Sequence, residues 1–440
     1  MKKQGLMIGS RFMFELRKGL RKLWVRTSFF AGSGIAVVAL TPLISPFLPT
    51  WLAEIEAANA IESILNILAT SMLAVTTFSV SIMLTAYGAA SGSGTPRAVT
   101  LLKEDVTSQM VLATFLGSFL FSLFALIGVR SGVFDKAGRV VLFFATMWVV
   151  MAVVLALIRW ITHLTSFGRL EDTVARVEVA AVDAMRMRVD QPFLGGKPLV
   201  DLDEDWQDRW TPVYPEASGY LCHVDMPALQ KMAQAAGGSD GPPQIRLDVL
   251  PGSFVHRKRA LVWLSPLVMQ DKDSAACMDT ACKAFTIAAA RTFDQDPRFG
   301  LSVLSEIAER ALSPAVNDPG TALDVLGRQF RVLELWHKDA PEDAPDFAQV
   351  EVPGLSMDDL LEDAFAAIAR DGAGVVSVQL RLQKLLFALT QTRPTLFAKP
   401  ALRLSYRAMS EVGKSSIYAE DLRRIEAAHK ALHDRVIALA

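Results

Sequence analysis

Cysteine is scarce in this sequence, with only three residues among 440, Cys222, Cys277 and Cys282. An odd and widely spaced set does not form a disulfide framework. Cys277 and Cys282 also lack the spacing and the partner ligands of a zinc site. We therefore expect reduced thiols, as in the cytoplasm.

The motifs of the common enzyme classes are missing as well. The sequence has no phosphate-binding Gly-Lys-Ser/Thr loop, no dinucleotide-binding glycine pattern, no Gly-x-Ser-x-Gly turn and no zinc-protease histidine pair. His429 and His433 have a spacing that could bind a metal, but Lys430 and Arg435 indicate a solvated face without a third ligand. The sequence therefore offers no catalytic residue, no metal site and no cofactor, and an enzyme at the inner leaflet is the least supported function.

A net charge of one sign is also absent. Lys and Arg number 45 against 46 Asp and Glu, so no overall attraction to nucleic acid is expected. Hydrophobic residues reach 51%, which is high for a soluble protein, yet 21% of the residues are charged. These values fit a chain that is divided into an apolar part and a charged part, and the length predicts more than one folding unit.

Four apolar runs occupy the front third of the chain. Each is at least as long as the ~20 residues that a helix needs to cross a bilayer. The runs extend roughly over residues 27–48, 61–87, 109–129 and 139–163, and Trp51, Trp148 and Trp160 lie near several of their ends. The sequence therefore predicts four transmembrane helices, of which the second is the most polar.

Basic residues predict the orientation of these spans. Eight Lys and Arg stand in residues 1–26, opposed only by Glu15, whereas the loop after the first run carries Glu54, Glu56 and Glu62 and no basic residue. Three basic residues in the third loop weaken the contrast without reversing it. Because basic flanks stay inside, we expect the N-terminus in the cytoplasm, and four crossings return the C-terminal part to the same side.

Small and polar residues of the second run follow one helical face. They recur in steps of four and three: Asn66, Thr70, Ala74, Thr77, Ser81, Thr85 and Gly88. One interpretation is a close helix–helix contact, since small residues let backbones approach. The other is a solute pathway lined by several copies of this helix, with candidate lining residues Asn66, Thr70, Thr77, Ser81 and Thr85.

No acidic or basic residue lies in the middle of any predicted span. Intramembrane charged residues are the usual mark of proton relays and buried ion-pair switches. Their absence argues against a proton-driven carrier more than against a passive channel.

The rest of the chain changes character twice. A charged helical stalk is expected over residues 166–193, and Gly/Pro punctuation with short apolar runs predicts a small β-rich module over 194–270 with one helix at 227–236. Helical patterns return over residues 274–292, 297–312, 319–337, 356–371, 374–391 and 402–440.

Two blocks in this part carry a family resemblance. Residues Asp294–Leu301 (DQDPRFGL) and Ala311–Ala322 (ALSPAVNDPGTA) resemble the signature of DUF2254, a family of predicted bacterial membrane proteins of unknown function. Ser218–Tyr220 with Pro251–Val255 is similar to another block of that family. The resemblance covers nearly the whole chain and implies the architecture and a bacterial inner-membrane location, but no activity.

The second block contains the strongest candidate for a special loop, formed by Ser313, Pro314, Asn317, Asp318 and Pro319. It is interpreted either as a rigid connector, with Asn-Asp-Pro capping the next helix, or as a surface for a ligand or subunit.

Together these patterns predict a mostly α membrane protein with a cytoplasmic α+β domain. Its expected parts are a basic N-terminal segment (1–26), a four-span domain (27–165), the stalk (166–193), the β-rich module (194–270) and a helical region (271–440). The predicted function is an oligomeric channel or solute-pathway protein with a cytoplasmic regulatory domain. The alternative is a non-transporting scaffold or envelope-stress sensor. Expected partners are the bilayer, further copies of the chain and an unidentified cytoplasmic protein.

Overall fold

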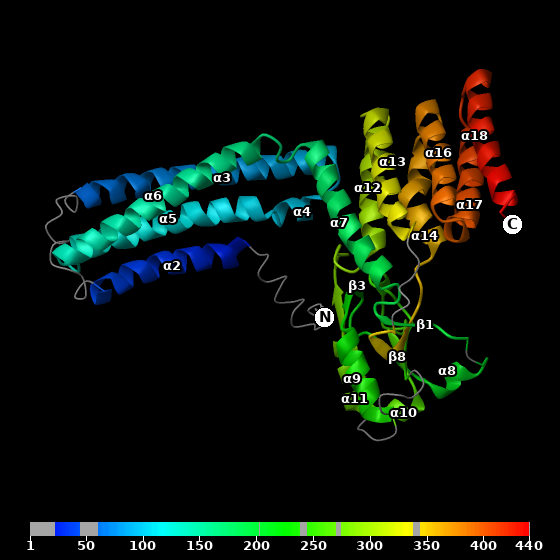
Figure 1. The fold of residues 1–440 in the computed structure, drawn as a ribbon, viewed down its shortest axis with the longest axis horizontal. Coiled ribbons are helices and arrows are strands. Elements are labelled where there is room, and N and C mark those ends of the chain that lie inside the picture. The colour runs from blue at the N-terminus through cyan, green and yellow to red at the C-terminus, as the bar shows by residue number, and fades with distance from the viewer. Residues whose placement is uncertain are drawn as a thin grey trace. The chain divides into compact units, whose positions relative to one another are not determined.

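The structure is a computed structural model that describes residues 23–44, 60–201, 203–237, 244–269, 274–337 and 344–439 (Figure 1). The chain forms two compact units that divide between Thr173 and Val174. We call them the helical unit, up to Thr173, and the α+β unit, from Val174 onward. Mostly helical secondary structure with a separate α+β region agrees with the predicted fold class.

The helical unit is built around one central helix. Its elements are α2 (Leu23–Ile44), α3 (Ile61–Ser93), α4 (Val99–Lys103), α5 (Val106–Arg130) and α6 (Lys136–Leu164). Helix α5 packs against α2, α3 and α6. Its contact with α2 is close because Gly117 faces Phe30, where an added Cβ would lie 3.2 Å from the Phe30 Cβ. Asp105 begins α5 by accepting a hydrogen bond from Ser108 N at 2.7 Å.

Within the described residues, three helical stretches are long and apolar enough to cross a membrane: Ile61–Ser93, Val99–Arg130 and Lys136–Leu164. They correspond to the second, third and fourth predicted spans. The apolar stretch of α2, Thr27–Leu43, is shorter, and residues 45–48 of the first predicted span lie outside the described residues. The predicted count of four spans is therefore not confirmed. The basic segment 1–22 and the acidic loop with Trp51 also lie outside the described residues.

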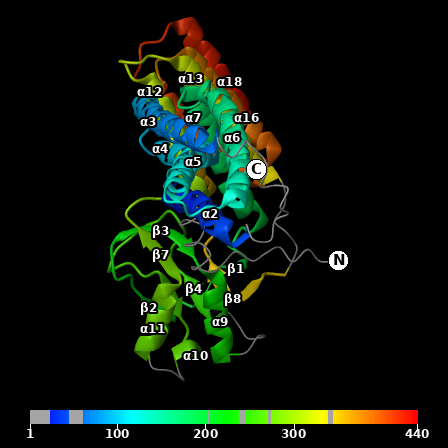
Figure 2. The same ribbon diagram turned by 90° about the vertical axis from the view of Figure 1, so that its left-hand side faces the viewer.

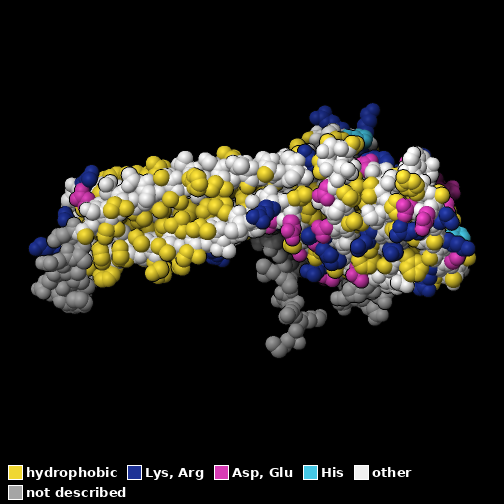
Figure 3. Space-filling model, turned by 90° about the horizontal axis from the view of Figure 1, so that it is seen from above, with side chains coloured by type: hydrophobic (Ala, Val, Ile, Leu, Met, Phe, Trp, Pro, Cys, Tyr) yellow, Lys and Arg dark blue, Asp and Glu magenta, His cyan; other side chains and the backbone are white. Residues whose placement is uncertain are grey.

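Much of the outer surface of these helices is apolar. Phe78 on α3 and Trp148 on α6 are 67% and 76% exposed, and Ile67, Leu84, Ile158 and Ile161 are exposed as well. Figure 3 shows apolar side chains gathered over this unit and charged side chains gathered over the α+β unit. Exposing so large an apolar surface to water is unfavourable, whereas the hydrocarbon of a bilayer accommodates it.

Two sheets form the centre of the β-rich module. The larger has the order β1 (Gly196–Pro198), β8 (Phe347–Val352), β4 (Ile245–Leu247), β6 (Val262–Leu264) and β2 (Thr211–Val213). β8 pairs in parallel with β1 and β4, and the other pairs are antiparallel. The smaller sheet is antiparallel, in the order β5 (Phe254–Val255), β3 (Gly219–Val224) and β7 (Phe285–Ala288).

Three helices pack against these sheets and close one core. They are α9 (Met226–Gly237), α10 (Pro266–Met269) and α11 (Ser274–Lys283), and Figure 2 shows them grouped beyond the strands. A short helix, α8 (Trp206–Arg209), precedes β2. The core includes Leu221, Ile245, Val262, Phe285 and Val350, all buried.

Two strands of these sheets come from outside the predicted module of residues 194–270. Strand β7 lies within the predicted helix 274–292, which instead ends at Lys283. Strand β8 lies nearly eighty residues beyond the module boundary. Both strands carry β-branched and aromatic residues that gain their partners only through long-range pairing, which local helical patterns do not reveal.

A helical bundle makes up the rest of the α+β unit. It contains α7 (Leu170–Asp190), of which residues from Val174 belong to this unit, α12 (Pro297–Leu312), α13 (Pro319–Glu334) and η4 (Leu335–His337). The later elements are α14 (Met357–Leu361), the π-helical turn η5 (Glu362–Ala366), α15 (Ala367–Asp371), α16 (Val376–Thr392), α17 (Pro394–Val412) and α18 (Ala419–Ile437). The predicted helix 402–440 is wrong in extent, since residues 413–418 separate α17 from α18.

Helix α7 is a packed member of this bundle and not a free-standing stalk. Ala181 lies against Gly300 of α12, where an added Cβ would come within 2.4 Å of the Ala181 Cβ. Glu178 forms ion pairs with Arg328 at 2.6 Å and Arg331 at 2.7 Å, both on α13. Burial raises the pKa of Glu178, but these two arginines outweigh it, so that the pKa lies below its ordinary value.

We predict that Glu178→Gln destabilises the chain in a pH-dependent manner. Because the folded-state pKa is lowered, the ionised carboxylate stabilises the fold above its ordinary pKa of 4.5, and this contribution is lost as the pH falls through the folded-state value. The free energy of unfolding at neutral pH should fall by about 1.5–3 kcal/mol, as for hydrogen bonds to charged groups. Denaturation of the purified chain in detergent measures it.

The matched control is Glu426→Gln on the exposed side of α18. It should change the free energy of unfolding little at any pH. A Glu178→Gln defect that does not shrink as the pH is lowered below the ordinary carboxyl pKa of 4.5 would contradict the ion-pair explanation.

Candidate functional site

The polar stripe on α3 lies on the outside of the helical unit. All five candidate residues, Asn66, Thr70, Thr77, Ser81 and Thr85, are exposed, as are Ala74 and Gly88 on the same stripe. The opposite face of α3 carries Leu65, Leu68, Met72 and Met83, which are buried. The stripe is therefore not used for packing among the described residues of one copy.

The hydroxyl groups of the stripe are satisfied within their own helix. Thr77 Oγ1 donates to Leu73 O at 2.9 Å, Ser81 Oγ to Thr77 O at 3.1 Å, and Thr85 Oγ1 to Ser81 O at 3.0 Å. Thr70 Oγ1 likewise donates to Asn66 O at 2.6 Å. The hydroxyl protons are used, so each oxygen presents only acceptor capacity outward.

Asn66 differs from the hydroxyl residues. Among the described residues its side-chain amide has no hydrogen-bond partner. An amide that faces hydrocarbon without a partner costs roughly 2–7 kcal/mol, depending on the reference state. This position therefore favours polar surroundings, such as water or a second polar side chain.

Ser81 and Thr85 line a groove with a volume of about 520 Å³. Its other wall is the turn Phe167–Arg169 that follows α6. Gly168 has a φ of +78°, and an added Cβ would lie 2.7 Å from the Ala86 Cβ, so glycine lets this turn approach α3. The groove thus combines hydroxyl oxygens and small residues with the exposed cationic side chain of Arg169.

A polar cluster at the start of α5 was not predicted. His163 Nε2, on α6, lies 3.0 Å from Asp105 Oδ2, which also accepts hydrogen bonds from Ser108 N and Oγ at 2.7 Å each. Ser108 Oγ lies 3.2 Å from the same imidazole nitrogen. One nitrogen thus faces both groups and the serine hydroxyl donates to the carboxylate, which is the geometry of a helix cap and not of a nucleophile relay. The Asp-x-x-Ser spacing was the available sequence signal.

The family-motif loop lies at the tip between α12 and α13. Asp318 caps α13 by accepting from Thr321 Oγ1 at 2.6 Å and Thr321 N at 3.1 Å, and these hydrogen bonds lower its pKa. Asn317 has a φ of +51°, in the left-handed region that asparagine tolerates. Ser313 Oγ donates to Arg310 O at 2.7 Å. Ser313 and Asp318 thus shape the turn, and a role in binding a ligand or subunit stays a prediction.

The other two resemblance blocks meet in a buried ion-pair cluster. Arg291 donates to both oxygens of Asp296, at 2.7 and 3.0 Å, and Asp296 caps α12 through Phe299 N at 3.2 Å. Burial raises the pKa of Asp296, which the charge of Arg291 opposes. Gly252 has a φ of +96°, and an added Cβ would lie 2.3 Å from Asp296 Oδ2. The Pro251-Gly252 turn and the DQDPRFGL block are therefore one structural unit.

The histidine pair of α18 serves packing contacts. His429 Nδ1 lies 2.6 Å from Ser405 Oγ, and its ring contacts Tyr406. Across the described ranges, no group of three His, Cys, Asp or Glu side chains has the arrangement to hold a metal ion.

Comparison with known proteins agrees with this architecture. The family model described as "Predicted membrane protein (DUF2254)" matches residues 21–388. The chain is 28% identical over 323 residues to the uncharacterized proteins Mb1321c of Mycobacterium bovis and Rv1290c of Mycobacterium tuberculosis. The match covers 69% of this chain and 58% of each relative, so it spans little more than half of their length. No solved structure matches the chain.

We predict that Gly252→Ala destabilises the fold by more than about 1 kcal/mol, because a positive φ and a clash with Asp296 act together. The control is Gly327→Ala in α13, where an added Cβ meets nothing within 4 Å. Alanine there should be neutral or stabilise by up to about 1 kcal/mol. Thermal unfolding of both variants measures the difference. Equal unfolding temperatures would contradict the structural role of the Gly252–Asp296 contact.

Proposed function

Because the chain belongs to the DUF2254 family of predicted membrane proteins, we propose that it is a homo-oligomer of the bacterial inner membrane in which α3 lines a pathway for ions or small solutes. The α+β unit lies in the cytoplasm and regulates this pathway. The basic residues of the N-terminal segment support the orientation, since basic flanks stay on the cytoplasmic side.

One observation carries the proposal: a continuous polar face on α3 is exposed in the single chain. Lipid tails offer no hydrogen bond to the Asn66 amide or to the hydroxyl oxygens of Thr77 and Ser81. Water donates hydrogen bonds to these oxygens, and cations are coordinated by them. If several copies turn this face towards one axis, the apolar residues on the remaining surface still meet lipid.

Small residues make such an assembly sterically possible. Added Cβ atoms at Gly88 and Gly92 would meet nothing within 4 Å, so no contact inside the described chain requires glycine there. In membranes, small residues spaced four apart let neighbouring helices approach closely. The same helix can therefore supply both the contact between copies and the lining of the pathway.

The lining chemistry limits what could pass. Hydroxyl oxygens without a charged ring give weak coordination and little charge selectivity. The exposed Arg169 at the groove favours anions at that end. We therefore expect a passive pathway with low selectivity between ions.

A scaffold or sensor is the second candidate function. It is favoured by the rigid loop between α12 and α13, at whose tip Val316 is 52% exposed. A fixed turn would present Val316 to a partner protein at a low ordering cost. A stoichiometric cytoplasmic partner that is lost on Val316→Asp, from a chain without transport activity, would support this function.

We predict that Ser81→Cys makes solute flux sensitive to a thiol reagent. The purified variant, with Cys282 replaced by Ser, is reconstituted into liposomes and treated with a cationic methanethiosulfonate. A charged adduct in a narrow lumen should reduce ion flux about fivefold or more. The control is Val154→Cys on the exposed surface of α6, where flux should not change. Absence of any flux from the untreated protein, or equal sensitivity of both variants, contradicts the pathway.

Self-association is tested separately from flux. Thr77→Cys in membranes should form an oxidised dimer between copies, because α3 faces α3, whereas Val154→Cys should not. Cross-linking of Thr77→Cys without any flux would mean that α3 packs against another copy but does not line a pathway. If neither variant forms a dimer, α3 does not face another copy of itself.

A further inference from the structure

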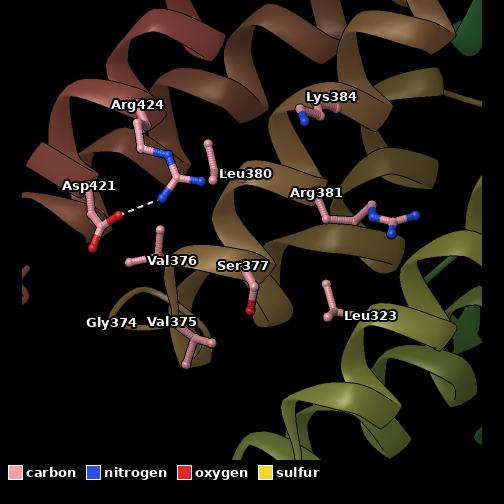
Figure 4. A pocket seen from close by; sticks show the side chains of 10 residues that line it. All are labelled: Leu323, Gly374, Val375, Val376, Ser377, Leu380, Arg381, Lys384, Asp421 and Arg424. Atoms are coloured by element: carbon pink, nitrogen blue, oxygen red, sulfur yellow. Dashed lines mark hydrogen bonds and ion pairs between the residues drawn. The ribbon is translucent and has the colours of Figure 1, made fainter.

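A cleft in the bundle of the α+β unit is not explained by the pathway. It lies between α13, α16 and α18 and has a volume of about 650 Å³ (Figure 4). This volume is within the ~300–1,000 Å³ typical of small-molecule sites. The cleft is independent of the proposed function.

The cleft has an excess of positive charge. Arg381 and Lys384 line it, and neither has an ion-pair or hydrogen-bond partner among the described residues. Arg424 reaches in from α18 and bonds to Asp421 at 2.7 Å. The cleft thus holds three cationic side chains and one carboxylate, which pairs with Arg424 alone.

Several other arginines of this bundle have carboxylate partners. Arg298 pairs with Asp359 and Asp363, and Arg328 pairs with Glu178 and Asp324. Arg403 and Arg407 bind Asp358 and Glu362. These arginines are compensated by nearby carboxylates, whereas Arg381 and Lys384 have none among the described residues.

The first turn of α16 adds to the positive field. The helix has 17 residues, no side-chain cap at Val375 and no acidic residue in its first turn. Its Val376 and Ser377 line the cleft. A helix N-terminus carries about half a positive elementary charge and offers free N–H donors, which here supplements the three cations.

The walls of the cleft are apolar. Figure 4 shows Leu380 between Arg424 and Arg381, with Leu323 of α13 on the opposite side of Ser377. A bare inorganic ion would leave these walls without contacts. The arrangement suits a ligand with a strongly anionic part and an apolar part.

We propose that this cleft binds an organic phosphate. The phosphate oxygens accept hydrogen bonds from Arg381, Lys384 and Ser377, and the apolar part packs on Leu323 and Leu380. Phosphate matches several cations better than a carboxylate because it carries up to two charges and has more acceptor oxygens. Soluble phosphate esters and phospholipid headgroups share this chemistry.

The test uses the full chain in zwitterionic phosphatidylcholine nanodiscs, with 1-naphthyl phosphate as probe in titration calorimetry. We expect saturable binding that weakens as salt is raised, since the contacts are ionic. Inorganic phosphate and 1-naphthol each carry one half of the probe, so each should bind about tenfold or more weakly.

A double variant and a matched control locate the site. Arg381→Ala with Lys384→Ala should weaken probe binding about tenfold or more. Arg423→Ala with Lys430→Ala removes the same charge from exposed positions of α18 outside the cleft, and binding should stay within about twofold of wild type. Equal losses in both double variants would show a non-specific charge effect and overturn the assignment.

A second arm distinguishes the source of the phosphate. Phosphatidic acid is added to the chain in detergent, and the bound lipid is counted by native mass spectrometry in the same variants. Lipid retention that depends on Arg381 and Lys384 identifies a headgroup site, and probe binding without it identifies a soluble ligand. If neither probe nor lipid binds in a manner that depends on these two residues, the proposal is wrong.

Discussion

The apolar outer surface of α3 and α6 must lie against hydrocarbon, and the rest of the structure follows from this constraint. Inside a bilayer every backbone N–H and C=O needs an internal partner, so the chain crosses as helices. Helix α5 gives these helices a shared contact surface, while side chains such as Phe78 and Trp148 remain outside. In such surroundings a line of polar residues on an outward face is conspicuous, because lipid does not compensate it.

The α+β unit follows another logic. Its shape is fixed by polar contacts that are buried or partly buried: Asp296 with Arg291, Glu178 with two arginines of α13, and Asp318 at the start of α13. Two of the three resemblance blocks form one of these clusters around Gly252. The residues of these blocks therefore have a role in stabilising the fold. The cationic side chains of Arg381 and Lys384 in the cleft beside α16 have no such role in the described contacts.

Local signals predicted part of this architecture. Asp318-Pro319 marked the first residues of α13, because an acceptor followed by proline suits a helix start. The short apolar runs of the predicted β-rich module include strand β3, Gly219–Val224. Three of the apolar runs became helices of transmembrane length. In each case the determinant lies within a few residues of the element.

What depends on distant partners was missed. β8 joins the sheet through contacts with β1 and β4, more than a hundred residues earlier. The packing of α7 depends on Gly300 and α13, and Arg381 and Lys384 line a cleft only because α13 and α18 form its other walls. The polar stripe could be found, since one helix carries it, but its exposure depends on which face α5 covers.

The most direct test of the account is a spin-label accessibility scan along α3, from residue 66 to residue 88, in the reconstituted chain. Labels at exposed apolar positions such as Ile67 and Phe78 should be accessible to oxygen, which concentrates in hydrocarbon. Labels at Thr77, Ser81 and Thr85 should instead be accessible to a water-soluble nickel complex, with the three- and four-residue steps of the stripe. If the labels on the stripe and those on the apolar face showed the same high oxygen accessibility, α3 would be surrounded by lipid and the pathway would not exist.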